Sequence, residues 1–69
     1  MKKEKYELAI EDYTYSLKLN SDFLVSLTNR GICLFKLGHK KKACLDWKQA
    51  ASKGHKGAKK YYEKYSTTL

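Results

Sequence analysis

Four segments of this 69-residue chain place apolar side chains at the spacing of an α-helix, and this feature limits the possible folds most. Residues three, four and seven positions apart lie on one face of a helix, so each segment would carry one apolar stripe. No segment shows the sustained alternation of a half-buried strand. The chain also has no proline and only four glycines, which excludes a flexible linker. The sequence therefore predicts an all-α protein of about four helices.

The apolar stripes also predict where the helices begin and end. Asn20 tolerates the left-handed conformation that ends a helix, and Ser21 or Asp22 could cap the start of the next one. Gly38 and Gly54 are natural ends for the second and third helices. Because the connections are short, consecutive helices should pack antiparallel. The four stripes are Tyr6, Ala9, Ile10, Tyr13 and Leu17; Leu24, Leu27, Gly31, Leu34 and Phe35; Ala43, Cys44, Trp47, Ala50 and Ala51; and Ala58, Tyr61, Tyr62 and Tyr65.

Small and large residues follow a particular order in the second and third segments. Glycine inside a helix costs roughly 1 kcal/mol relative to alanine, so Gly31 is best explained by close approach of the next helix. Ala43 would face it, with Trp47 filling space farther along. Part of the order recurs 34 residues earlier, in Ala9, Tyr13 and Ser16. The full order is Gly31, Leu34, Gly38, Ala43, Trp47 and Ala50.

This order and its 34-residue period resemble the tetratricopeptide repeat family. The resemblance implies a fragment of a right-handed solenoid of stacked antiparallel hairpins. Residues 4–20 would be the second helix of a partial repeat, residues 22–53 a complete repeat and residues 57–66 a C-terminal capping helix. Residues 50–58 are also similar to the linker of Sel1-like repeats. Because the partial repeat lacks its first helix, residues 1–20 should expose an apolar face or pair with a second copy of the chain.

The resemblance also implies a function, because members of the family are scaffolds that bind peptides or proteins in a concave groove. Asn29 is similar to the asparagine that contacts a peptide carboxylate in chaperone-binding relatives, although the basic partners of that clamp are missing here. The apolar groove positions instead favour an extended or helical peptide with hydrophobic anchors. By spacing, the groove-lining candidates are Val25, Thr28, Asn29, Ile32, Phe35 and Lys36.

The net charge of +8 is unevenly distributed. Residues 1–23 carry −1 and residues 24–69 carry +9, which raises a second hypothesis of polyanion or nucleic-acid binding. The simpler interpretations are a solvated lysine face or an acidic protein partner, and the single arginine argues against reading of bases. The predicted basic surface is Lys40, Lys41, Lys42, Lys56, Lys59 and Lys60.

The sequence offers few residues for chemistry. His39 and His55 fall in turns, and Cys33 and Cys44 belong to apolar stripes, as expected for buried reduced thiols. The alternatives for the two cysteines are a disulfide between helices or, with the histidines, part of a metal site. Their spacing does not match the closely paired ligands of small zinc modules. There are no paired carboxylates in a pocket and no glycine-rich phosphate loop. We therefore expect no enzymatic activity, no metal and no cofactor.

The length of the apolar stretches and the sequence of the N-terminus bear on where the protein is located in the cell. No stretch approaches the roughly 20 apolar residues of a membrane-spanning helix, and the charged start has no signal-peptide core behind it. The expectation is a cytoplasmic protein that does not bind membranes.

Overall fold

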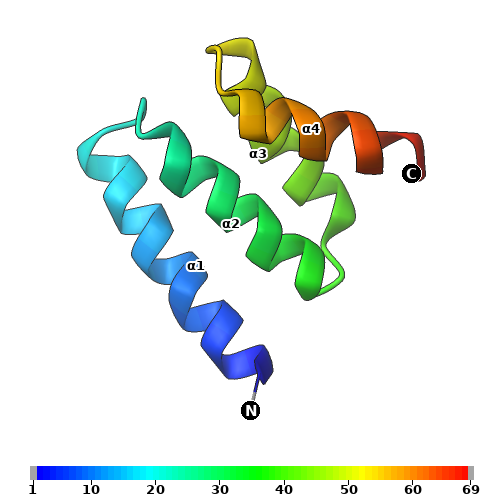
Figure 1. The fold of residues 1–69 in the computed structure, drawn as a ribbon. Helices are drawn as coiled ribbons and strands as arrows, with labels where there is room; N and C mark the ends of the chain where they lie inside the picture. Colours follow the sequence, from blue (N-terminus) through cyan, green and yellow to red (C-terminus); the bar gives the residue numbers. More distant parts are fainter. Residues whose placement is uncertain (1, 69) are drawn as a thin grey trace.

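The computed structural model describes residues 2–68 and contains four α-helices in the order α1 to α4 (Figure 1). No strand occurs among these residues, so the predicted all-α class and the number of helices are confirmed. The first and last helices begin and end within two residues of the predicted ranges 4–20 and 57–66, and the second and third lie within the predicted 22–53. Their bounds are Lys2–Leu19 for α1, Leu24–Lys36 for α2, Lys40–Ser52 for α3 and Lys56–Tyr65 for α4, followed by a short 3₁₀ turn at Ser66–Thr68.

Two glycines end helices as predicted. Gly38 has φ of 90° and Gly54 has φ of 97°, a left-handed conformation that strains residues with a Cβ. After each glycine, the next N–H returns to the last turn of the helix: His39 donates to the Leu34 carbonyl at 2.9 Å and His55 to that of Ala50 at 3.1 Å. These bonds satisfy carbonyls that the helix end would otherwise leave unpaired.

The end of α1 differs from the prediction. None of the described residues other than glycine has positive φ, so Asn20 does not form a left-handed cap. Its side-chain oxygen instead accepts the Asp22 N–H at 3.0 Å. The prediction that Ser21 or Asp22 caps α2 is also wrong, because Phe23 occupies the N-cap position without a side-chain hydrogen bond. The Asn20 side chain therefore bonds within the turn, and neither Ser21 nor Asp22 occupies the N-cap position of α2.

The helices stack in sequence order, with α2 between α1 and α3, and α3 between α2 and α4. Consecutive helices reverse direction, and α4 crosses in front of α3 (Figure 1). The molecule is flat, with dimensions of 29 × 29 × 14 Å. This arrangement leaves α2 and α4 on the same side of the stack, both packed on α3.

Trp47 lies at the centre of the contact between α2 and α3. The indole is 1% exposed and donates its N–H to the Thr28 carbonyl at 3.1 Å. A Cβ on Gly31 would lie only 2.5 Å from the indole nitrogen, so glycine is required for this close approach. The expected close contact at Gly31 is therefore present, but the indole itself fills the space that we had assigned to Ala43. Ala43 is fully buried in the same core.

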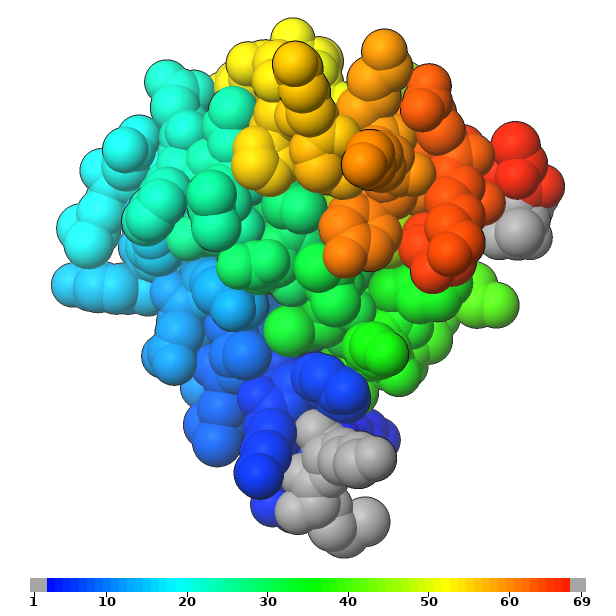
Figure 2. All heavy atoms as spheres, in the orientation of Figure 1, coloured from blue at the N-terminus to red at the C-terminus, as the bar shows by residue number. Residues whose placement is uncertain are grey.

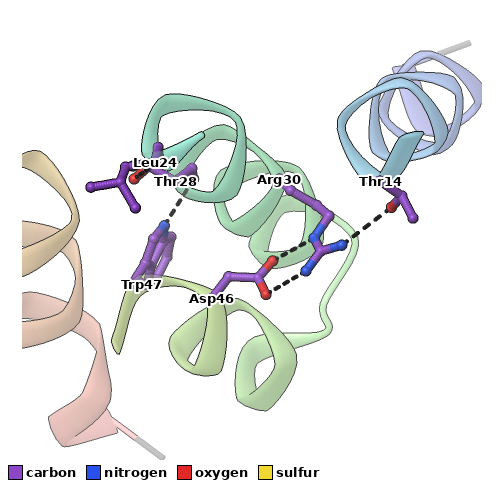
Figure 3. A network of polar contacts seen from close by, with 6 residues as sticks. All are labelled: Thr14, Leu24, Thr28, Arg30, Asp46 and Trp47. Atoms are coloured by element: carbon purple, nitrogen blue, oxygen red, sulfur yellow. Dashed lines mark hydrogen bonds and ion pairs between the residues drawn. The ribbon is translucent and has the colours of Figure 1, made fainter. Parts of the chain in front are cut away.

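A charged pair joins three helices on another side of α2 (Figure 3). Arg30 donates from Nε and from one terminal nitrogen to the two carboxylate oxygens of Asp46, at 2.8 and 2.9 Å. The other terminal nitrogen lies 3.3 Å from Oγ1 of Thr14 on α1. The hydrogen bonds to Asp46 raise the pKa of Arg30 above its ordinary value. The two-pronged contact ties α2 to α3, and the longer bond to Thr14 adds one contact with α1.

Candidate functional site

A pocket of about 610 Å³ lies on the side of the stack where α2 and α4 are neighbours. Figure 2 views this side, with α2 in green and α4 in orange and most of α3 behind them. The pocket takes residues from three helices, and Trp47 is the residue that α3 contributes. Its walls are Ile32, Phe35, Lys36, Trp47, Tyr61 and Tyr65.

Aromatic rings form most of the lining. The centroids of Phe35 and Tyr65 are 4.4 Å apart, which joins the wall on α2 to the wall on α4. Trp47 stacks on Tyr61 with centroids 5.2 Å apart and planes inclined by 19°. Rings in such contact hold one another in place, so the pocket is largely preformed. A preformed apolar pocket binds a ligand side chain with little ordering cost.

Ammonium groups surround the aromatic lining. Lys36 is part of the wall, and Nζ of Lys40 lies 5.8 Å from the centroid of the Phe35 ring. Nζ of Lys64 lies 5.3 Å from the centroid of Tyr65. None of the residues that line the pocket is acidic. The pocket thus combines an apolar aromatic interior with a positively charged rim.

The six predicted groove residues do not all reach this pocket. Ile32, Phe35 and Lys36 line it. Val25 is 52% exposed and Asn29 is half-buried, and neither contributes to the lining. Placing Thr28 in an open groove was wrong, because this residue is 5% exposed and its hydroxyl donates to the Leu24 carbonyl at 2.8 Å. The carbonyl of Thr28 also accepts the indole N–H, so the residue belongs to the contact between α2 and α3.

Our reading of the sequence missed the contribution of α4 to the pocket. We had interpreted Tyr61 and Tyr65 only as apolar-stripe residues of a closing helix. A signal was present, because Tyr61 and Tyr65 follow Leu27 and Gly31 by the same 34 residues that separate the two halves of the pattern. By that count α4 repeats α2, and side chains at equivalent positions of the two helices would face one groove.

The residues of the predicted basic surface lie on two helices. Lys40, Lys41 and Lys42 form the first turn of α3, whereas Lys56, Lys59 and Lys60 belong to α4, and all six are exposed. Lys56 begins α4 just after α3 has ended, about 15 Å along α3 from the first group. Nearby Lys53, at the end of α3, pairs with Asp22.

The remaining candidates for chemistry are in structural positions. His39 and His55 are the N-cap residues of α3 and α4. Cys33 and Cys44 are free and buried, and burial raises the pKa of both thiols, which disfavours the nucleophilic thiolate. Within residues 2–68, no three or more His, Cys, Asp or Glu side chains gather as a metal site. The helices described here are too short or too polar to cross a membrane.

Comparisons with protein-family models, with curated proteins and with solved structures find no match for this chain. The class of the protein is therefore given by its own geometry. It is an all-α stack of four helices with an aromatic pocket between the second and the fourth.

Proposed function

We propose that this chain is a non-catalytic protein-interaction module of the tetratricopeptide type, which binds a peptide segment of a partner protein between α2 and α4. The observation that carries the proposal is the preformed aromatic pocket with its cationic rim. Sequential stacking of the helices supports it as well, because stacked hairpins offer the groove between alternate helices as an extended surface.

The lining specifies the chemistry of the peptide. Phe35, Tyr61 and Tyr65 offer ring surfaces to one large apolar side chain, which would act as the anchor. Lys36, Lys40 and Lys64 favour carboxylates on either side of that anchor, since opposite charges speed association and fix the register. The proposed partner is therefore an acidic peptide segment with an aromatic or large aliphatic residue at its centre.

The test is a binding experiment with two matched peptides. One carries a central anchor residue, leucine or phenylalanine, between acidic residues, and the other has alanine in place of the anchor. Neither peptide contains tryptophan. Trp47 is the only tryptophan in the chain and forms the pocket floor, so its fluorescence reports occupancy. Calorimetry gives the affinity, and backbone NMR shifts locate the bound peptide.

Variants separate the pocket from the rest of the surface. Ile32→Ala and Lys36→Glu should each weaken binding of the anchored peptide by about tenfold or more. Leu19→Ala is a matched control, because Leu19 is 73% exposed and does not line the pocket. If a panel of anchored acidic peptides produces no shifts in α2 and α4, or if Leu19→Ala weakens binding as much as Ile32→Ala does, the proposal is refuted.

Binding of a polyanion or nucleic acid is the alternative. The exposed lysines on α3 and α4 and the tyrosines of α4 favour it. The two hypotheses differ in which residues matter. Polyanion binding should fall steeply with salt and depend on Lys40, Lys41 and Lys42 more than on Ile32. Filter binding of RNA or DNA without a salt-sensitive signal would exclude this alternative.

A further inference from the structure

A second surface lies between α1 and α3, away from the pocket between α2 and α4. Two adjoining hollows of about 270 and 280 Å³ share Ile10 and Thr14 as common walls, so together they form one shallow groove, here called the α1–α3 groove. The groove also takes residues from α2. Its lining is Ile10, Glu11, Thr14, Tyr15, Lys18, Arg30, Leu34, Lys42, Leu45 and Asp46.

The centre of the α1–α3 groove is apolar and exposed. Tyr15 on α1 and Leu45 on α3 are each 64% exposed, and Ile10 and Leu34 also belong to the lining. Large apolar side chains gathered on one face of so small a protein indicate an interaction surface.

The lining of this groove carries charges of both signs. Its α1 side contributes Glu11 and Lys18, and its α3 side contributes Lys42 and Asp46. Along α3 there are four lysines against a single carboxylate, and Arg30 already neutralises that carboxylate, Asp46. In the described part of the chain, neither ion pair involves Glu11, Lys18 or Lys42, the charged lining residues other than Arg30 and Asp46.

We propose that the α1–α3 groove is the interface of a two-fold symmetric dimer of this chain. A two-fold axis places α1 of one copy against α3 of the other, and the reverse, so that Glu11 of each copy faces Lys42 of the other. The apolar centres meet across the axis and bury Tyr15 and Leu45. A second copy is the favoured occupant, because Glu11 and Lys42 lie on the two sides of the groove and a two-fold axis sets each against its opposite charge.

The size of the surface sets the expected strength. A stable interface buries about 800 Å² on each partner, about one sixth of the 5013 Å² surface of this chain. The α1–α3 groove is shallow, so the dimer should be reversible and should form over the micromolar range. Sedimentation velocity over a concentration series is the appropriate measurement, at low and at high salt.

Charge reversal tests the symmetry directly. Glu11→Lys sets like charges against Lys42 of the second copy, and Lys42→Glu sets like charges against Glu11, so each variant should sediment as a monomer. An equimolar mixture of the two variants should dimerise again, because each lysine then faces a glutamate in the other chain. Recovery in the mixture cannot arise within one chain.

Apolar variants complete the test. Leu45→Asp should weaken the dimer by about tenfold or more, while Val25→Asp, at an exposed position of α2 that does not line the groove, should not. Circular dichroism checks that both variants remain folded, and Ile32→Ala should leave the dimer intact, which keeps this test independent of peptide binding. A wild-type chain that is monomeric at every concentration overturns the proposal, as does a dimer that survives Leu45→Asp or a variant mixture that stays monomeric.

Discussion

Replacing Gly31 by alanine tests the contact on which the stack of α2 and α3 depends. The added Cβ would lie 2.5 Å from Nε1, 2.8 Å from Cδ1 and 3.0 Å from Cε2 of Trp47. Carbon atoms in ordinary contact are about 3.5–4.0 Å apart, so the indole or the backbone must move. The ring has little freedom, because its N–H is bonded to Thr28 and its faces contact Phe35 and Tyr61.

The magnitude follows from three contributions to the free energy of unfolding. Overpacking of a dense core costs about 1–3 kcal/mol. Displacing the indole loses its hydrogen bond, about 1 kcal/mol. Alanine in the middle of a helix gains about 1 kcal/mol over glycine. The last two offset each other, so Gly31→Ala should lower the stability by about 1–3 kcal/mol.

Urea unfolding followed by Trp47 fluorescence and by circular dichroism measures this loss. In a thermal melt, Tm should fall by at least about 4 °C for a domain of this size. Gly57→Ala is the matched control, since Gly57 is also helical but its added Cβ would meet only the His55 side chain, at 3.3 Å, which can rotate away. That variant should be unchanged or gain up to about 1 kcal/mol. If Gly31→Ala is as stable as the wild type, the indole is not fixed over Gly31 and the reasoning fails.

Two further predictions concern buried polar groups. Asp46→Ala should lower the stability by about 1–2 kcal/mol, because it leaves the partly buried Arg30 without its carboxylate. A double-mutant cycle with Arg30→Ala measures how much of this loss is coupling between the two residues. Additive effects of the two substitutions would contradict a direct pair. Cys33 and Cys44 should react slowly with a thiol reagent at neutral pH in the native chain and rapidly in denaturant. Since folding raises their pKa, the unfolded chain loses these protons first, and stability should fall as the pH rises above about 8.5. Rapid labelling of the native chain, or no loss of stability at high pH, would contradict burial of the thiols.

Part of the candidate site was predictable from the sequence. The resemblance to a helical repeat placed Ile32, Phe35 and Lys36 on one open face of α2, and all three line the pocket. The prediction for Thr28 was wrong because this residue lies on the side of α2 that faces α3. Helical spacing alone does not say which neighbour covers which side of the helix.

The opposite wall of the pocket was not predicted. Tyr61 and Tyr65 were assigned to the apolar stripe of a closing helix, and their place in the pocket depends on how α4 crosses α3. The pair of Arg30 and Asp46 was missed for a similar reason. These residues are sixteen positions apart on different helices, and no local pattern distinguishes them from solvated charges.

The periodicity of the sequence specifies the helices, their approximate bounds and the glycines that end two of them, because these features depend on residues within a few positions of each other. The packing of the helices specifies the contacts that join distant residues. These are the indole over Gly31, the pair of Arg30 and Asp46 between α2 and α3, the pocket between α2 and α4, and the groove between α1 and α3. Such contacts depend on the angle and depth at which one helix meets the next, and those follow from the shapes of all side chains in the contact together.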